Sequence, residues 1–184
     1  MAKGKADISN TAIRIFFQEA GEFYDKARGY KKYTSSKGNK TILLDFFKYE
    51  CCYCGAKLDF DSMSQDHLVP LNKTALGLHA WGNVVPACKD CNEEKQQGDW
   101  VDFLERKSDS NNFRERRDRI DSFITKYKYS PNLGENLSVI ATNLYEDVGE
   151  VAQTLINLRY RQAEKTIKEL IQAEQGLRGS GADE

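Results

Sequence analysis

The five cysteines of the chain fall into two groups, with Cys51, Cys52 and Cys54 together and Cys88 and Cys91 forming a second pair. Cys51 and Cys54 are separated by two residues, as are Cys88 and Cys91, a spacing that lets a tight turn aim both sulfur atoms at one tetrahedral ion. Thiolates favour zinc. Two matched pairs make the alternative of buried free thiols the weaker interpretation. The sequence therefore predicts a structural Zn²⁺ site with no open coordination position, so any chemistry must lie elsewhere. Cys52, the spare cysteine, belongs to neither pair, and we expect it to be a small residue of the core or of the surface.

Polar residues between and just after these pairs could hydrolyse a phosphate ester. Asp66, His67 and Asn83 lie between the pairs, and Asn92 and Lys95 follow the second pair. An imidazole with its ordinary pKa of about 6.5 can accept a proton from water near neutral pH. A hard cation such as Mg²⁺ prefers oxygen ligands. A histidine after an aspartate is by itself more often structural, but its position inside the cysteine frame favours catalysis.

The order of these residues resembles the HNH, or ββα-metal, endonuclease family. Members carry an acidic residue and a histidine on a first strand, an asparagine before a second strand, and an asparagine or histidine on the following helix. The resemblance covers about residues 50 to 98, including Pro70 and the Cys-Asn-x-x-Lys ending. Asn92 makes the chain an H-N-N variant. The loop from Lys73 to Trp81 has only Gly77 where many members carry a glycine pair, which leaves its substrate contacts open.

This resemblance implies a role for each residue of the motif. His67 is the general base, and Asp66 and Asn92 are ligands of a catalytic Mg²⁺ or Mn²⁺. In a regular strand Asp66 and His67 would point to opposite sides, but the family bends here so that both reach the site. Asn83 ties down the loop and fixes the imidazole, and Lys95 contacts substrate phosphate.

His79 is the other histidine, and two interpretations stay open for it. It can contact substrate, as we expect for the site, or simply lie on the surface of the loop between the two strands.

The charge of the chain bears on its substrate. The formal net charge of -1 at pH 7 is nearly neutral, so any surface for DNA must be a local patch of Lys and Arg. Arg114, Arg116, Arg117 and Arg119 form one basic cluster, but interleaved acidic residues favour a solvated helix face with internal salt bridges. A group formed by Arg159, Arg161, Lys165 and Lys168 is a comparable candidate.

Periodicity predicts an α+β protein in which a zinc-stabilised ββα-metal module is flanked by N- and C-terminal α-helices. Apolar residues step by three and four from Asn10 to Gly29, and a short helix is expected from Thr41 to Tyr49. Two short strands are expected at 65–69 and 83–86, followed by a helix from near Cys91 to Gly98. The regions are then 1–49 (N-terminal helical), 50–98 (nuclease module), 99–175 (C-terminal helical) and 176–184 (disordered tail).

Two features of the C-terminal region stand out. Asp99 is the expected N-cap of a helix, and a turn is expected at 130–135. From Leu137 to Leu158 apolar residues again step by three and four, which predicts a long helix or a pair kinked at Gly149. We interpret this stripe as core, with a dimer interface as the alternative.

The sequence thus predicts a metal-dependent HNH endonuclease that cuts DNA, with a restriction or defence role suggested by the family. Two rivals remain: a nuclease acting on RNA, and a non-catalytic zinc module that binds nucleic acid or protein. A homodimer or a partner protein is expected, because two copies of a one-site nuclease most simply cut both strands. The sequence shows neither a long apolar run nor a secretory leader, so we expect no membrane association and a cytoplasmic location.

Overall fold

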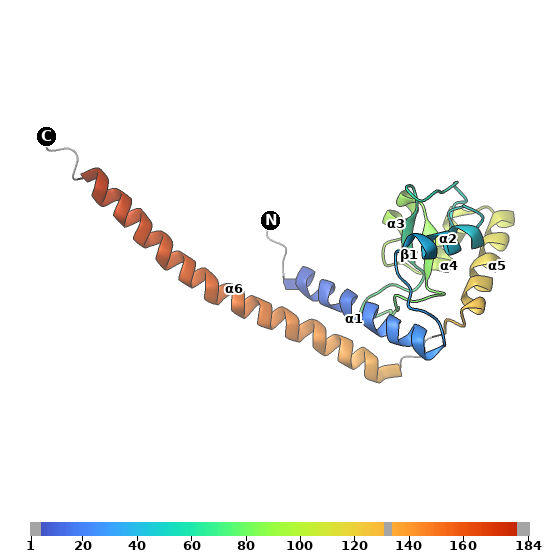
Figure 1. Ribbon diagram of the computed structural model, residues 1–184, viewed down its shortest axis with the longest axis horizontal. Helices are drawn as coiled ribbons and strands as arrows, with labels where there is room; N and C mark the ends of the chain where they lie inside the picture. The colour runs from blue at the N-terminus through green and yellow to red at the C-terminus, as the bar shows by residue number, and fades with distance from the viewer. Residues whose placement is uncertain (1–4, 131–133, 180–184) are drawn as a thin grey trace.

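The computed structural model describes residues 5–130 and 134–179 (Figure 1). Within these ranges, helices surround one small antiparallel sheet. The elements follow one another as α1 (Lys5–Ala27), α2 (Lys37–Phe46), β1 (Ser64–His67), β2 (Val84–Ala87), α3 (Lys89–Lys95), α4 (Trp100–Lys107), α5 (Ser110–Lys126) and α6 (Gly134–Gly179). The predicted α+β class, a small strand pair flanked by helices on both sides, is confirmed.

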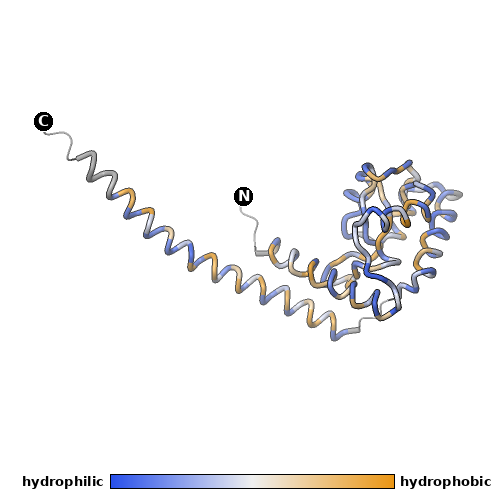
Figure 2. The backbone as a smooth tube through the Cα atoms, viewed as in Figure 1, coloured by the Kyte–Doolittle hydropathy of each residue, from blue (hydrophilic) through white to orange (hydrophobic). Residues whose placement is uncertain are grey.

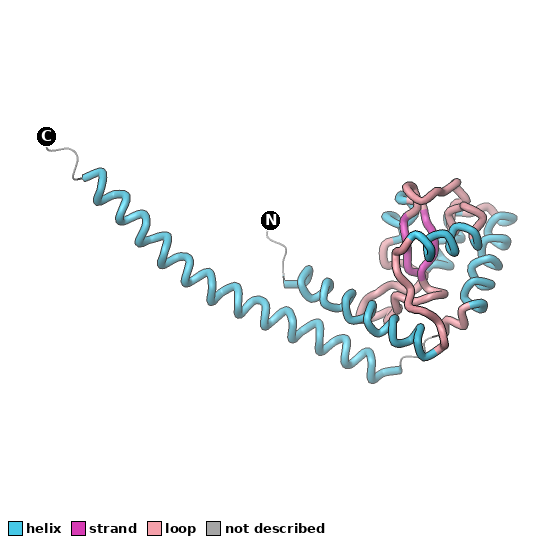
Figure 3. Tube along the Cα trace, viewed as in Figure 1, coloured by secondary structure: helices cyan, strands magenta, loops and turns pink. Residues whose placement is uncertain are grey.

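The two strands form the centre of the module, as Figure 3 shows. β1 and β2 are antiparallel, with Ser64 opposite Ala87 and His67 opposite Val84. Every residue of β2 is buried, because Val84, Val85 and Ala87 pack into the main core. β1 is polar in sequence, and only Asp66 is buried in it. The hairpin therefore buries β2 in the core and presents residues of β1 near solvent.

Helices on either side complete the main core. α2 contributes Leu43 and Leu44, and α5 contributes Ile120 and Phe123, all of them fully buried. Asp99 caps α4 as predicted, because its Oδ1 accepts hydrogen bonds from the N–H groups of Val101 and Asp102. These contacts hold the strand pair between α2 on one side and the α4–α5 pair on the other.

A second core lies between α1 and α6, which run side by side in opposite directions (Figure 1). Ile13 and Phe17 of α1 pack with Leu78 and Ala80 of the loop before β2 and with Ala141 of α6. α1 therefore lies between α6 and the loop that leads into β2.

The apolar stripe of α6 is only partly core, which corrects the interpretation of the whole stripe as buried. Leu137, Ala141 and Leu144 pack against the second core. Beyond the reach of α1 the helix projects away from the module, and Figure 2 shows apolar and polar residues alternating along it. Val151 and Leu155 are 59% and 54% exposed. Periodicity predicted the helix correctly but could not tell how far its partner helix would extend.

Several boundaries differ from the sequence-based expectations. α1 begins at Lys5, before the expected start at Asn10, and α2 lies a few residues earlier than expected. α6 is one helix with no interruption at Gly149, and it includes residues 176–179, where a disordered tail was expected. Residues 180–184 and 131–133, the latter part of the expected turn, lie outside the described ranges. None of the described helices, α6 included, has a segment apolar enough to cross a lipid bilayer.

Candidate active site

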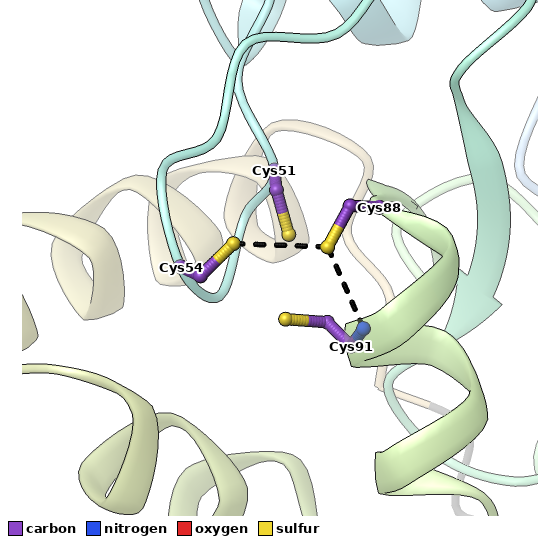
Figure 4. A group of neighbouring side chains, drawn as sticks. All are labelled: Cys51, Cys54, Cys88 and Cys91. Atoms are coloured by element: carbon purple, nitrogen blue, oxygen red, sulfur yellow. Dashed lines mark hydrogen bonds between the residues drawn. The ribbon is translucent and has the colours of Figure 1, made fainter.

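The four paired cysteines converge, as Figure 4 shows: Cys51 and Cys54 come from the loop before β1, and Cys88 and Cys91 from the start of α3. Their sulfur atoms all lie within 4.8 Å of one another, and those of Cys54 and Cys88 are 3.7 Å apart. A tetrahedral ion with Zn–S bonds of about 2.3 Å requires sulfur atoms about 3.8 Å apart. The four cysteines are therefore arranged for a zinc site.

The pKa values of these thiols are also consistent with a site for a bound cation. Burial raises the pKa of Cys51 to about 11, and burial raises the pKa of Cys91 as well. Both thiols would keep their protons at neutral pH if the protein alone surrounded them, and a bound cation is what stabilises thiolates in such a place. All five cysteines are free of disulfides.

The first cysteine pair is linked directly to the residues of β1 and β2. Cys52, the spare cysteine, is buried, and its backbone N–H donates to the carbonyl of Pro86 at 3.0 Å. The fully buried Tyr53 donates a hydrogen bond from its hydroxyl to Oδ2 of Asp66 at 2.6 Å. Sequence reasoning missed Tyr53, although an aromatic residue inside a cysteine pair is a signal that it faces the core. The zinc knuckle thereby positions Asp66.

His67, Asp66 and Asn92 line one open cavity of about 490 Å³. β1 supplies the first two, and α3 supplies Asn92 one residue after the zinc-site residue Cys91. The local chain therefore brings Asp66 and His67, which alternate along a strand, to a common space. The cavity lining is Arg14, Gln65, Asp66, His67, Pro70, Leu71, Asn92, Gln96 and Gln97.

The two carboxylate oxygens of Asp66 differ in their contacts with the protein. Oδ2 accepts the hydrogen bond from Tyr53 and pairs with the ammonium of Lys95 at 3.1 Å. In the described part of the chain, Oδ1 makes no hydrogen bond, and neither does the side chain of Asn92. The carboxylate and amide oxygens at the cavity are therefore not used by other protein groups, and such hard donors suit a divalent cation such as Mg²⁺.

Lys95 does not lie where the sequence suggested. Its side chain is fully buried, and its ammonium donates to the backbone carbonyl of His67 at 2.8 Å in addition to pairing with Asp66. It does not line the cavity. The structure therefore assigns Lys95 to holding Asp66 and His67 in place, which corrects the expected contact with substrate phosphate.

Asn83 is buried before β2 and secures the loop that connects the strands. Its Oδ1 accepts from the N–H of Val69 at 2.8 Å, and its Nδ2 donates to the carbonyls of Val69 and Leu78 at 2.9 and 2.8 Å. This amide holds both ends of the loop from residue 69 to 78. It makes no hydrogen bond to the imidazole of His67, so any effect on that ring is exerted through the loop.

His79 lies against His67, and Nδ1 of His79 is 2.9 Å from Nε2 of His67. His79 also packs on the ring of Tyr33. It is half-buried and does not line the cavity. Burial lowers the pKa of His67 to about 3, and the positive charges of His79, when it is protonated, and of Lys95 and Arg14 act in the same direction. Burial likewise lowers the pKa of His79. Both rings are therefore neutral near pH 7, and one donates its N–H to the other.

Arg14 also lines the cavity, although no sequence pattern pointed to it, because it lies in α1, far from the cysteine frame. The basic cluster on α5, in contrast, is engaged with neighbouring residues. Arg119 pairs with Glu50 at 3.0 Å and with Glu115 at 2.6 Å, and Arg116 donates to the carbonyl of Tyr53 at 2.9 Å. Arg119 with Glu115, and Arg117 with Asp121 at 3.7 Å, form internal salt bridges of the kind expected on this helix face.

Comparisons with known families agree with this geometry. Residues 51–102 match the family model of the HNH endonucleases. This module belongs to the HNH endonuclease family and carries a four-cysteine site. This match supports a nuclease-type function for the module.

Similarity beyond the module is low. Among solved structures, the chain is similar to the Type II-C Cas9 enzyme from Actinomyces naeslundii, with 21% sequence identity and a TM-score of 0.37. That match covers 71% of this chain and 14% of the Cas9 chain, so this protein spans a small part of that enzyme's length. No curated protein matches the chain.

Proposed function

We propose that the protein is an endonuclease that uses a divalent cation, Mg²⁺ or Mn²⁺, to hydrolyse phosphodiester bonds in DNA. The observation that carries this proposal is that His67, Asp66 and Asn92, from two different elements of the HNH module, line one open cavity. A neutral imidazole beside oxygen donors for a hard cation is the combination that phosphodiester hydrolysis requires.

The base is assigned to one atom of His67. Nε2 of His67 faces Nδ1 of His79, and within the described residues Nδ1 of His67 makes no hydrogen bond. If Nε2 carries the hydrogen and donates it to His79, Nδ1 has a free lone pair and accepts the proton of the attacking water. His79 then acts as a positioning residue that fixes the tautomer of the base, in place of the substrate contact expected from the sequence.

Asp66 and Asn92 are proposed to hold the cation through their side-chain oxygens. When bound, this cation would withdraw negative charge from the phosphate during hydrolysis. Lys95 and Tyr53 keep Asp66 in place by occupying Oδ2, which leaves Oδ1 available. By resemblance to the family, we propose that the products are 5′-phosphate and 3′-hydroxyl ends.

Substitution of the base tests this mechanism. His67→Ala should lower the rate of plasmid cleavage by at least about a hundredfold, the usual contribution of a general base. The variant should keep its zinc content and its thermal unfolding profile. Cleavage by His67→Ala at the parent rate would overturn the assignment.

A direct comparison of cleavage distinguishes DNA from RNA as the substrate. The proposed metal site contacts only phosphate, so the choice of DNA is supported by the family resemblance. Labelled DNA and RNA of the same sequence, digested side by side with Mg²⁺, should show cleavage of DNA. Cleavage of RNA alone would mean that RNA, and not DNA, is the substrate. Cleavage of neither nucleic acid would favour the rival interpretation of the protein as a binding module.

We propose that two copies of the chain associate through the outer part of α6. The apolar face that α1 covers near Leu144 continues beyond α1, where Leu155, Ile167 and Leu170 are 54%, 55% and 61% exposed. An antiparallel second copy would cover this face as α1 covers the first half, and two nuclease sites could then cut both strands.

Light scattering should give the mass of a dimer for the parent protein. The double variant Leu155→Glu with Ile167→Glu should give the mass of a monomer, whereas Val139→Glu should remain a dimer. A parent monomer at all concentrations would contradict this.

A role in restriction or defence is proposed on the family resemblance. The cytoplasm is proposed as the location, because a reducing compartment keeps the four cysteines available for zinc. Expression of parent and His67→Ala proteins in cells challenged with foreign DNA would test the first of these proposals, since only the parent should reduce the recovery of that DNA.

A further inference from the structure

The cavity that holds the catalytic candidates is completed from outside the HNH module. Arg14 of α1 lines it together with Asp66, His67 and Asn92, although α1 precedes the matched residues 51–102. Among the residues that line the cavity, Arg14 is the only arginine or lysine. The cavity thus combines oxygen donors for a cation with one cationic side chain.

The position of Arg14 is fixed by the way α1 docks on the active-site loop. The neighbouring Ile13 and Phe17 are buried in the second core. The backbone N–H of His79 donates to the carbonyl of Phe17 at 3.2 Å. One turn further along, a Cβ on Gly21 would lie 2.4 Å from the carbonyl oxygen of His79, so only glycine permits this approach. α1 is therefore held against the same loop that carries the partner of His67.

The guanidinium of Arg14 has no partner among the residues that the structure describes. The residue is exposed, and no described residue forms an ion pair or a side-chain hydrogen bond with it. Two arginines elsewhere in the molecule are occupied: Arg28 pairs with the buried Asp25 at 2.6 Å, and Arg119 pairs with Glu50. Lys95, the cation expected to meet phosphate, is buried with Asp66. A guanidinium left unpaired beside a proposed hydrolytic site is suited to an anion with paired oxygens.

We propose that Arg14 binds the phosphodiester that is cut in this cavity, through hydrogen bonds from its guanidinium to the non-bridging oxygens. The proposal rests on the proposed function. During hydrolysis the water oxygen bonds to phosphorus and one proton of the water passes to His67. The bond from phosphorus to the 3′ oxygen breaks, and the leaving 3′ oxygen takes a proton from solvent water to become the 3′-hydroxyl. In the transition state the negative charge on the non-bridging oxygens is larger than in the substrate. Arg14 stabilises that charge and keeps its own protons while it does so.

Three variants of the full-length protein test this role. Arg14→Ala removes the guanidinium, Arg14→Lys keeps the charge without the paired donors, and Arg114→Ala is the matched control. Arg114 is an exposed arginine that lines a different cavity, of about 520 Å³, on α5. Arg14 and Arg114 are both exposed, so each variant should fold with unchanged thermal unfolding.

Single-turnover cleavage of a DNA duplex with Mg²⁺ gives the first measurement. Arg14→Ala should cleave about tenfold to a hundredfold more slowly than the parent, the range expected for losing a charged hydrogen-bond donor. The cleavage rate of Arg14→Lys should lie between those of Arg14→Ala and the parent, and the rate of Arg114→Ala should equal that of the parent. If the parent cleaves DNA and Arg14→Ala cleaves at the same rate, the proposal is overturned while the proposed function stands.

Binding gives a second measurement that does not depend on cleavage. In the His67→Ala background, fluorescence anisotropy of a labelled duplex measures affinity across a series of salt concentrations. Adding Arg14→Ala should reduce the slope of log affinity against log salt by about one, as expected for one lost phosphate contact, whereas adding Arg114→Ala should not. If no protein cleaves DNA, this slope still decides the matter, and an unchanged slope for Arg14→Ala rejects the phosphate contact.

Discussion

The four-cysteine cluster and the His67 cavity are built from the same short segments but differ in nearly every physical property. In the cluster, four identical soft donors face one another and would fill the coordination sphere of one ion. In the cavity, the donors are mixed, partly unpartnered and open to solvent, and a cationic arginine joins them from a distant helix. A closed site can only stabilise the fold, whereas an open one can exchange water and substrate.

The two sites are nevertheless in direct contact. Tyr53 sits between the first two zinc-site cysteines and donates to Asp66, and α3 supplies Cys91 to the cluster and Asn92 to the cavity. Consecutive residues of a helix point about 100° apart, so one helix can serve both sites at once. The geometry of the cavity therefore depends on the closed cluster, while the reverse dependence is not expected.

The largest expected effect comes from removing the closed site. Cys88→Ser, or a strong zinc chelator, should unfold the module, because structural zinc contributes on the order of 10 kcal/mol in small domains. Circular dichroism should show loss of secondary structure together with loss of bound zinc by elemental analysis. Asn92→Ala, one residue from Cys91, is the matched control and should keep both. A Cys88→Ser protein that kept the parent melting profile would refute a structural role for the cluster.

An intermediate effect is expected from Lys95, which supports the cavity from inside the core. Lys95→Met should destabilise the protein by about 3 kcal/mol, because Asp66 would stay buried without its cation. Denaturation in urea measures this loss, and adding Asp66→Asn should recover part of it, since the uncompensated charge is then removed.

The exposed pair of Lys57 with Glu50 serves as the control for that experiment. Lys57→Met removes a similar ion pair, at 2.9 Å, but the Lys57 side chain is 79% exposed. Water and salt screen such a pair, so the variant should unfold close to the parent. If Lys95→Met were as mild as Lys57→Met, Lys95 would not be what holds Asp66.

The contrast between the two sites also explains what could be predicted from the sequence. The cluster depends on local spacing, since each cysteine pair forms within one turn of chain, and its four residues were identified correctly. The strands around Asp66 and Asn83 were located within one or two residues for the same reason. The burial of Lys95 was missed, because helical spacing placed it near Asn92 without showing that Asp66 would turn an oxygen toward it.

Contacts between distant segments could not be predicted in this way. Arg14 reaches the cavity only because Ile13 and Phe17 dock α1 on the loop that carries His79, and no local pattern encodes that docking. The pairing of His67 with His79 depends on the path of the same loop. The exposure of the outer half of α6 depends on where α1 ends, although the periodicity of both helices was recognised.

The smallest expected effect is in the pH dependence of cleavage. An ordinary histidine base, with a pKa of about 6.5, would lose about tenfold in rate from pH 7.5 to pH 5.5. Burial lowers the pKa of His67 to about 3, so its imidazole stays neutral and able to accept a proton over this range. The single-turnover rate should therefore fall less than twofold. A rate profile with a midpoint near pH 6.5 would show that His67 is not buried as described, or is not the base.

Stability should respond to the same pH change more than activity does. The pKa of His67 and that of His79 are both lower in the folded protein than in the unfolded chain. Below about pH 6.5 the unfolded chain takes up protons that the folded protein does not, so stability is fully present above that pH and is lost progressively as the pH falls toward the folded values. Urea denaturation at pH 7.5 and 5.5 should show this loss, and His67→Ala should reduce it, because one of the two histidines that drive it is then absent.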